Sequence, residues 1–240
     1  TKSVSYNNFG KFEYTNMADK AAKYKGFTGD DVTAIPGFVN YSEGIYVGYK
    51  FYETASDEGL INYDDTVAFP FGYGLSYTSF DQKLDSVKYK GGKVTVTATV
   101  TNTGDKAGKD VVEVYYNPPY TDGGIEKASK NLAGFEKTKE LQPGESQKVT
   151  VKFDDDDMAS YDYKGAKAYM LEKGDYDISI QSDSHHVIDH KAITVKDTVT
   201  YDSDSNTHNG DKTVATNQFD DVAGDVTYLS RADHFANYKE

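Results

Sequence analysis

The stretch VTVTATVTNTG at residues 94–104 decides the fold class of this chain. Its valines and its one alanine alternate with threonines, so an extended backbone carries one apolar face and one polar face. This period of two is typical of a β-strand that buries one side. Asn102-Thr103-Gly104-Asp105 then predicts a tight turn, because Asn, Gly and Asp accept the backbone angles that turns require.

Short segments of the same alternating kind surround this stretch. We expect further strands at Leu84–Tyr89, Val111–Tyr116, Leu132–Thr138, Val149–Phe153, Tyr169–Leu171 and Tyr176–Ile180, and a closing segment from Val187 to Val195. Gly-Gly, Pro-Pro and Gln-Pro-Gly sequences between them mark turns. Short strands at this spacing predict an all-β fold, a two-sheet antiparallel sandwich of the immunoglobulin or fibronectin type III kind. The chain contains no Cys and no Trp, which favours the fibronectin-like variant over the antibody one.

Composition narrows the classes of partner. The 240 residues carry a formal net charge of −13, and such an acidic surface repels nucleic-acid phosphates and anionic lipids. Nucleic acids and membranes are therefore not expected as partners, and no apolar run approaches the roughly 20 residues that cross a bilayer. The lack of cysteine excludes disulfides, thiolate metal sites and a cysteine nucleophile. Cytoplasmic and secreted locations both stay open.

The region before the predicted sandwich is aromatic and irregular. Residues 14–24 predict a short helix with Asn16 as its N-cap. In YSEGIYVGYKFYET, residues 41–54, apolar and polar side chains alternate in part, which predicts a strand with one apolar face. Residues 67–80 contain Pro and Gly at short intervals and predict a tight connector packed by its aromatic rings.

The C-terminal region falls into two parts. Residues 198–216 are polar and nearly free of large aliphatic side chains, which predicts a mobile linker. Residues 217–240 regain apolar side chains without following a single period. We expect these last residues to form a tail that docks on a neighbouring domain.

Two aromatic motifs resemble segments of the family 3 glycoside hydrolases. Tyr41-Ser-Glu-Gly-Ile-Tyr-Val-Gly-Tyr-Lys-Phe-Tyr-Glu53 resembles the segment that leaves the α/β sandwich domain of these enzymes. Phe69-Pro-Phe-Gly-Tyr-Gly-Leu-Ser-Tyr-Thr78 resembles their connector into a fibronectin type III-like domain. Asn131-Leu-Ala-Gly-Phe-Glu-Lys137 and Met158-Ala-Ser-Tyr-Asp162 also fit, so the resemblance covers residues 38–195. One departure is Lys50, which stands where the family often has Arg.

The tail at residues 217–231, NQFDDVAGDVTYLSR, resembles the connector of a family branch with reversed domain order. In that branch a catalytic (α/β)₈ barrel follows the sandwich domains. The resemblance therefore implies three parts. Residues 1–79 are an N-terminal extension and connector from the α/β sandwich domain, 80–196 are the fibronectin type III-like sandwich, and 197–240 are a linker and tail leading toward a missing barrel.

The resemblance also implies a β-glucosidase-type parent, from a bacterial source, that hydrolyses terminal β-glycosidic bonds. Its catalytic and α/β sandwich domains would be this chain's partners, and a β-glucoside or oligosaccharide would be bound through them. Retaining glycosidases need two carboxyl groups roughly 5–5.5 Å apart. In the family the nucleophilic Asp lies in the barrel and the acid/base Glu in the α/β sandwich domain. We therefore assign no catalytic residue and no cofactor, and expect this chain alone to be no enzyme.

Acidic side chains offer three local candidates. Glu43 lies in the first family motif, either as a functional acid or as a strand carboxylate that pairs with a neighbour. Asp154–Asp157 is either a calcium site or an acidic turn that ends a strand. Asp202-x-Asp204-x-Asn206 begins like an EF-hand loop, but Thr207 and Thr213 replace its Gly and its bidentate Glu. The acidic-turn interpretation is preferred, and no metal site is assigned.

Histidine and tyrosine supply the other candidates. His185, His186 and His190 form a local trio, but adjacent residues of a strand face opposite ways, so we expect surface histidines rather than a zinc site. Tyr116 and Tyr120 flank two prolines, and Tyr120 is the one candidate for stacking on a sugar. Packing in the core or between domains is the competing explanation for both rings.

Three functions remain in competition. The first is a non-catalytic accessory part of a family 3 hydrolase that stabilises or positions the catalytic domains. The alternative is an independent carbohydrate-binding or adhesion β-sandwich module. The third is a structural spacer without a catalytic partner.

Overall fold

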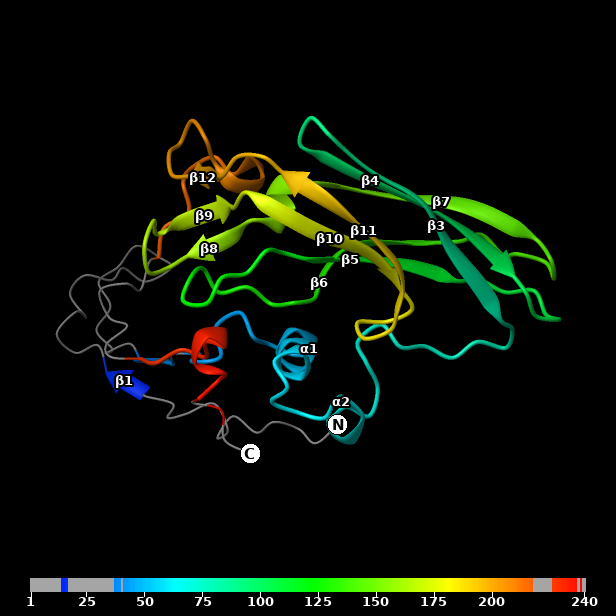
Figure 1. Cartoon of the computed structure of the whole chain (residues 1–240), viewed down its shortest axis with the longest axis horizontal. Coiled ribbons are helices and arrows are strands. Elements are labelled where there is room, and N and C mark those ends of the chain that lie inside the picture. Colours follow the sequence, from blue (N-terminus) through cyan, green and yellow to red (C-terminus); the bar gives the residue numbers. More distant parts are fainter. Residues whose placement is uncertain (1–13, 17–36, 40, 218–225, 237, 239–240) are drawn as a thin grey trace, which may run out of the picture. The chain divides into compact units, whose positions relative to one another are not determined.

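The computed structural model describes residues 14–16, 37–39, 41–217, 226–236 and 238 (Figure 1). These residues fall into two compact units. The larger unit comprises residues 45–216, and the smaller one comprises the described parts of 3–44 and 217–240. Within the described ranges no helix is long and apolar enough to cross a membrane.

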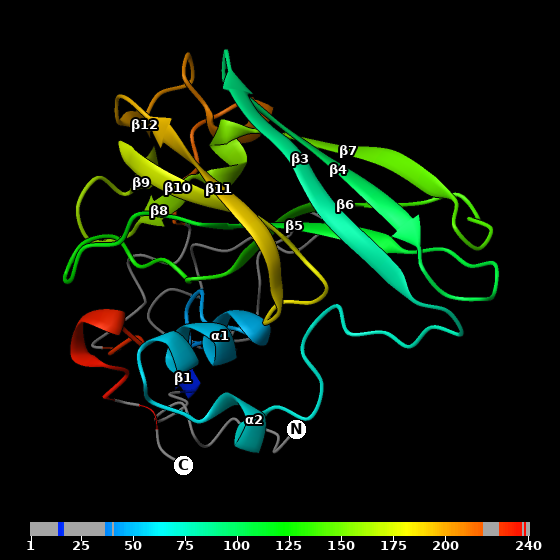
Figure 2. The same ribbon diagram turned by 45° about the vertical axis from the view of Figure 1, so that its right-hand side comes forward.

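The larger unit is an antiparallel β-sandwich (Figures 1 and 2). One sheet has the order β3-β4-β7, formed by Phe80–Lys90, Lys93–Asn102 and Ser146–Asp154. The second has the order β11-β10-β5-β6, formed by Val187–Val195, Gly174–Gln181, Val111–Asn117 and Asn131–Lys137. A small third sheet has the order β12-β9-β8, formed by Val199–Tyr201, Ala168–Leu171 and Ser160–Asp162. The predicted strands and the predicted all-β class are confirmed.

The core forms because apolar positions on facing strands recur with a period of two. In β4 the side chains of Val94, Val96, Ala98 and Val100 are buried while the threonines between them are half-exposed. In β10 the residues Tyr176, Ile178 and Ile180 have 0% exposure and join the same cluster. Burial of such side chains stabilises each by about 1.5–3 kcal/mol, which fixes the register of both sheets.

The turn between β6 and β7 follows the expected chemistry. Glu145 N donates to Gln142 O at 2.8 Å, which closes the turn predicted at Gln142-Pro-Gly-Glu145. Gly144 adopts a φ of +79°, the left-handed conformation that a type II turn requires at its third position.

The strand predicted over residues 41–54 is wrong. The backbone turns at residues 42–45 and then forms α1 (Tyr49–Asp57). Gly44 and Gly48 have φ values of +56° and +59°, which an extended strand cannot contain. The helix buries Phe51, Thr54 and Ala55, a spacing of three and four residues that matches the helical period rather than the strand period.

Helix α1 covers the outer face of the four-stranded sheet. It lies beside β5 and β6 in both views (Figures 1 and 2). Tyr49 OH accepts a hydrogen bond from Leu132 N at 3.0 Å, and Thr54 Oγ1 accepts one from Ser129 N at 3.0 Å. Part of the outer face of the sheet is therefore covered, and polar Gln181 on this face is 1% exposed, whereas most of β11 and the end of β6 are exposed.

The segment predicted as a mobile linker is folded in its first part. Residues 199–201 form β12, which pairs with β9, and Tyr201 is only 8% exposed. His208, in the short 3₁₀ helix η4 (His208–Gly210), stacks on Tyr169 with ring centroids 3.9 Å apart. The linker interpretation is wrong for these residues. The side chains of Tyr201 and His208 pack on the sandwich and hold the polar stretch against it.

The connector predicted over residues 67–80 follows the short helix α2 (Tyr63–Thr66) and has no regular structure, as expected. Its large apolar side chains, however, are exposed. Leu75 is 90% and Tyr77 99% exposed, so the expectation of an aromatic-packed connector is wrong for most of its length.

The smaller unit contains the antiparallel pair β1 (Tyr14–Asn16) and β2 (Gly37–Val39). The helix predicted over residues 14–24 is wrong at its start, and its remainder lies outside the described residues. The tail contributes the 3₁₀ helix η5 (Arg231–Asp233), and Leu229 N donates to Ser42 O at 2.8 Å. The tail thus contacts the N-terminal extension of the same chain.

Candidate functional site

Glu43 lies in a turn and not in the predicted strand. Its side chain is buried, with 9% exposure, and its Oε2 atom has no hydrogen-bond partner among the described residues. The structure therefore does not bear out the expected pairing of this carboxylate with a strand neighbour.

The four aspartates 154–157 form the acidic turn expected at the end of β7. Asp154 pairs with Lys93, and its backbone N–H donates to Asp157 Oδ2 at 3.1 Å. Asp155 accepts a hydrogen bond from Tyr89 OH at 2.6 Å. Asp156 Oδ2 accepts one from the backbone of Asn209 at 3.0 Å. These four carboxylates start the 3₁₀ helix η3 (Asp155–Met158) and tie it to its surroundings.

The EF-hand-like stretch is a local turn. Asn206 N donates to Ser203 O at 2.8 Å, and Asp204 Oδ1 accepts from the backbone of Val214 at 2.9 Å. Across the described parts of the chain, no group of three or more His, Asp or Glu side chains is placed to hold a metal ion.

The three neighbouring histidines do not converge on one site. Each Nδ1 meets a different carboxylate: His185 contacts Glu53 at 2.9 Å, His186 contacts Asp183 at 2.9 Å, and His190 contacts Asp177 at 2.8 Å. The hydrogen bond to Asp177 raises the pKa of the exposed His190. The three histidines therefore form three separate histidine–carboxylate pairs. Two lie in the β10–β11 turn and one lies in β11.

Tyr116 and Tyr120 are both half-buried. Tyr116 OH donates to Asp157 O at 3.3 Å, and burial raises the pKa of its hydroxyl. Tyr120 lies in the loop between β5 and β6. A role of Tyr120 in sugar stacking stays a prediction.

A buried cluster centred on Glu53 contains only one of the candidates that the sequence offers, His185. The Glu53 side chain, on α1, is 1% exposed. Its Oε1 accepts hydrogen bonds from Tyr63 OH and Ser184 Oγ, both at 2.6 Å, and its Oε2 lies 2.9 Å from His185 Nδ1. We call these four residues the Glu53 cluster.

The Glu53 cluster joins three segments that are distant in sequence: α1, α2 and the β10–β11 turn. The Tyr63 and His185 rings stack with centroids 3.6 Å apart and planes at 7°. Burial, followed by the hydrogen bond to Glu53, holds the pKa of Tyr63 far above its ordinary value, so its hydroxyl stays a donor. A carboxylate that is buried and meets three partners suits a structural cross-link, because its lone pairs are already occupied.

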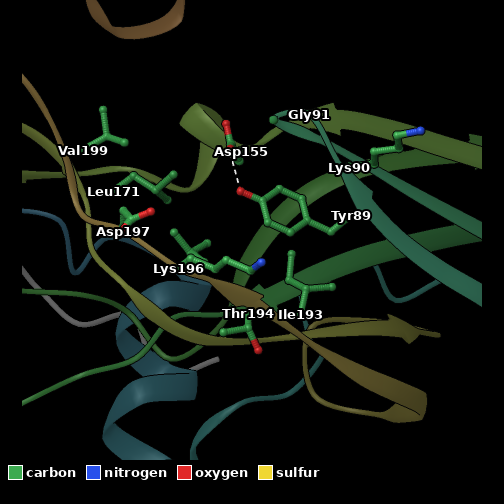
Figure 3. A pocket seen from close by; sticks show the side chains of 12 residues that line it. Tyr89, Lys90, Gly91, Asp155, Leu171, Ile193, Thr194, Lys196, Asp197 and Val199 are labelled. Atoms are coloured by element: carbon green, nitrogen blue, oxygen red, sulfur yellow. Dashed lines mark hydrogen bonds between the residues drawn. The ribbon is translucent and has the colours of Figure 1, made fainter.

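Figure 3 shows a surface groove of about 540 Å³ between the β3–β4 turn and the end of β11. Leu171, Ile193 and Val199 supply apolar lining, and Lys196 and Asp197 contribute charged side chains. The hydroxyl of Tyr89 donates to Asp155 across this groove, as the dashed line marks (Figure 3). Asp155 is therefore held by a neighbouring side chain.

A second groove, of about 570 Å³, is lined by Lys93, Thr95, Lys152, Phe153, Asp154 and Asp157. Here Asp154 is paired with Lys93 and Asp157 caps the start of η3. The carboxylates of this groove are therefore also engaged in local structure.

Comparison with known proteins identifies what this architecture is similar to. A family model described as "Fibronectin type III-like domain" matches residues 110–184. Beta-glucosidase A of Butyrivibrio fibrisolvens is 42% identical in an alignment 170 positions long that covers 63% of this chain and 19% of that protein. A beta-glucosidase of Ruminococcus albus is 41% identical in an alignment 162 positions long that covers 66% of this chain and 16% of that protein.

Solved structures give the same result. Beta-glucosidase 3B of Thermotoga neapolitana, in complex with α-D-glucose, superposes with a TM-score of 0.59 at 34% identity over 68% of this chain and 21% of that one. The beta-glucosidase of Kluyveromyces marxianus, in complex with glucose, gives a TM-score of 0.60 at 33% identity over 68% of this chain and 18% of that one. The chain thus spans about a fifth of the length of these relatives.

Proposed function

The chain carries the fibronectin type III-like domain of the family 3 glycoside hydrolases, and from this premise we propose that it is a non-catalytic accessory part of a β-glucosidase-type enzyme. Its task is to stabilise or position the domains that perform hydrolysis. One observation carries the proposal: the chain matches only about a fifth of the length of β-glucosidases, and a fibronectin type III-like family model matches residues 110–184.

The chemistry of the described residues supports a non-catalytic role. A retaining glycosidase needs two carboxyl groups roughly 5–5.5 Å apart across a sugar, one of them free to donate a proton. Glu53 is enclosed and meets three partners, Asp155 is bonded to Tyr89, and Asp154 is paired with Lys93. These acids serve local structure.

The partners follow from the relatives. The proposed partners are a catalytic barrel and an α/β sandwich domain of the parent polypeptide, and the proposed substrate of that parent is a terminal β-glucoside. The division into 1–79, 80–196 and 197–240, with a barrel after the tail, belongs to the same proposal. The resemblance of residues 217–231 to a reversed-order connector motivates it.

The proposal is tested by assaying the purified chain with an aryl β-glucoside. We expect no release of the aryl group above the buffer rate. Turnover that persists in the presence of a chelator would refute the non-catalytic role. Titration with cello-oligosaccharides separates the alternative function, since an independent carbohydrate-binding module would bind them at millimolar concentration and an accessory domain would not.

A further inference from the structure

The outward-facing side of the sheet β3-β4-β7 is basic, although the chain as a whole is acidic (Figure 2). In these strands buried positions alternate with positions that point away from the core. The outward positions carry six lysines and three aspartates: Lys83, Lys88, Lys90, Lys93, Lys148 and Lys152, and Asp81, Asp85 and Asp154. This side therefore has a formal charge of +3, in a chain whose net charge is −13.

A line of hydroxyl groups runs along the middle of this side. The central strand of the sheet is β4, and Thr95, Thr97, Thr99 and Thr101 alternate with its buried residues. Residues two positions apart in a strand are about 6.8 Å apart, so this line is about 20 Å long. We call these four threonines and the six lysines the Lys/Thr face.

Lysines lie on both sides of the line of threonines. Lys88 of β3 and Lys152 of β7 are both register partners of Thr95. Lysines flank Thr99 in the same way. Neighbouring strands lie about 4.8 Å apart, so the two lysines of such a row have Cα atoms about 10 Å apart. A linear polymer that lies along β4 would therefore find positive charge on either side.

Part of the positive charge is neutralised within the chain. Lys148 pairs with Asp85 at 3.2 Å, and Thr99 Oγ1 donates to the same carboxylate at 2.7 Å. Lys93 pairs with Asp154. The other four lysines of the face form no ion pair with any residue that the structure describes, so their charges are available to another partner.

The centre of the face also offers free hydroxyl groups. Within the described ranges, the side chains of Thr95, Thr97 and Thr150, the register partner of Thr97 on β7, make no hydrogen bond. The groove of about 570 Å³ described above opens at this place, since Thr95 and Lys152 line it. A ligand that carries hydroxyl and anionic groups would therefore meet partners of both kinds here.

We propose that the Lys/Thr face binds a linear polysaccharide that carries carboxylate groups, that is, a polyuronate. The threonine hydroxyls both donate and accept, so they can exchange hydrogen bonds with the hydroxyl groups of the sugar rings. The lysines on either side would bind the carboxylates through charge-assisted hydrogen bonds. This binding function lies beyond the proposed accessory role and does not depend on it.

The chemistry of the face favours a polysaccharide over a protein partner. Lys and Ser are depleted at the centre of protein interfaces, where aromatic residues, Met and Arg are enriched. The outward positions of these three strands contain no aromatic residue, no Met and no Arg. Lysines on the edge strands β3 and β7 also discourage pairing with other sheets, but the threonines on the central strand have no part in that function.

Nucleic acids and neutral sugars fit the face less well. Single-stranded nucleic acid binds by stacking of its bases on aromatic rings, which this face does not offer. Duplex DNA carries one charge per about 1.7 Å and is repelled strongly by a chain of net charge −13. A neutral sugar would leave the lysines without anionic partners.

The test measures binding of the 240-residue chain to polygalacturonate by calorimetry at low ionic strength. The neutral comparison is the fully methyl-esterified form of the same polymer. We expect the wild-type chain to bind the acidic form and not the neutral one, and added salt should weaken the binding because it screens the charges. No binding of polygalacturonate by the wild-type chain would overturn the proposal.

A pair of double variants locates the binding on the face. Lys88→Glu/Lys152→Glu reverses two charges beside Thr95, and Lys137→Glu/Lys191→Glu makes the same change in the other sheet, on β6 and β11. All four lysines are exposed, so the wild type and both variants should unfold at the same temperature. The first variant should bind polygalacturonate at least about tenfold more weakly, and the control almost as tightly as the wild type. An equal loss in both variants would show an effect of net charge alone and would overturn the proposed face.

The hydroxyl groups are tested separately from the charges. Thr97→Val/Thr150→Val keeps the branched shape of both side chains and should bind polygalacturonate several-fold more weakly, since two hydrogen-bonding groups are lost. Poly-glutamate, which carries carboxylates without sugar hydroxyls, should bind the wild-type chain more weakly than polygalacturonate does. Binding of poly-glutamate or of single-stranded DNA as tightly as polygalacturonate would assign the face to another class of polyanion. These results leave the accessory role untouched, because its test is the hydrolysis of an aryl β-glucoside.

Discussion

At the scale of single residues, Glu53 explains how the helical segment stays attached to the sandwich. Its carboxylate is 1% exposed and meets partners from α2 and from the β10–β11 turn. Burial of a carboxylate is tolerated only when its oxygens are hydrogen-bonded. Loss of any one partner of Glu53 should therefore make the burial of its side chain less favourable.

We predict that Glu53→Ala lowers the free energy of unfolding by about 2–4 kcal/mol, because Tyr63 OH and Ser184 Oγ lose their common acceptor inside the protein. Urea unfolding of the purified chain measures this. Asp57→Ala, an exposed acid on the same helix, should change the free energy by less than about 0.5 kcal/mol. Equal effects of the two variants would show that the Glu53 cluster contributes nothing.

His190 should report the pH dependence of a surface pair. Its hydrogen bond to Asp177 holds the imidazole pKa above the ordinary value of 6.5. A raised folded-state pKa means that the pair stabilises the fold at pH below 6.5 and that this contribution is lost as pH rises through the folded-state pKa.

Titration by NMR should therefore place the His190 pKa above 6.5 in the wild-type chain. In Asp177→Asn it should fall, because the carboxylate that favours the imidazolium is gone. An unchanged pKa in Asp177→Asn would contradict the pairing.

At the scale of elements, the path of the connector at residues 67–80 depends on Gly72, whose backbone passes close to Glu113. We predict that Gly72→Ala destabilises the chain by about 1–2 kcal/mol, since the methyl group displaces the Glu113 carboxylate and φ is +87°. Gly74→Ala is the control, because a β-carbon added at Gly74 would have no other atom within 4 Å. Urea unfolding that ranks the two variants equally would contradict the proposed close approach.

The strands of the sandwich could be predicted from sequence because their burial repeats strictly. In β4 every second residue from Val94 to Val100 is buried, so the pattern alone specifies the inward face. The closing strand β11 was also recognisable, although most of its residues are exposed.

Helix α1 could not be recognised in the same way. Ile45, Val47, Tyr49 and Phe51 alternate in sequence, but Ile45 and Val47 are 45% and 59% exposed. The residues that the helix buries include Glu53 and Thr54, whose burial is favourable only because Tyr63, Ser184 and Ser129 meet them. These contacts are tertiary, and no local pattern encodes them.

The candidate site shows the same limit. The sequence indicated surface histidines and an acidic turn. The acidic turn agrees with the contacts observed, and His186 and His190 are exposed, but His185 is half-buried against Glu53 and Tyr63. The sequence did not indicate that Glu53, Tyr63 and Ser184 meet, because these residues are separated by up to 131 positions.

At the scale of the whole molecule, the chain combines a filled sandwich core with an exposed connector at residues 67–80 that carries no charged side chain. The core cluster runs from Val87 to Tyr201 and occupies the space between the sheets. Exposed large apolar side chains concentrate instead on residues 41–77. Core and exposed apolar side chains are thus segregated along the sequence.

The most direct test of the accessory role is the rate of aryl β-glucoside hydrolysis by three samples: the chain alone, the remaining domains of its parent alone, and the two mixed. For the accessory role we expect no hydrolysis by the chain, reduced hydrolysis by the remaining domains, and recovery in the mixture. Hydrolysis by the chain alone, or a rate that the chain does not change, would contradict it.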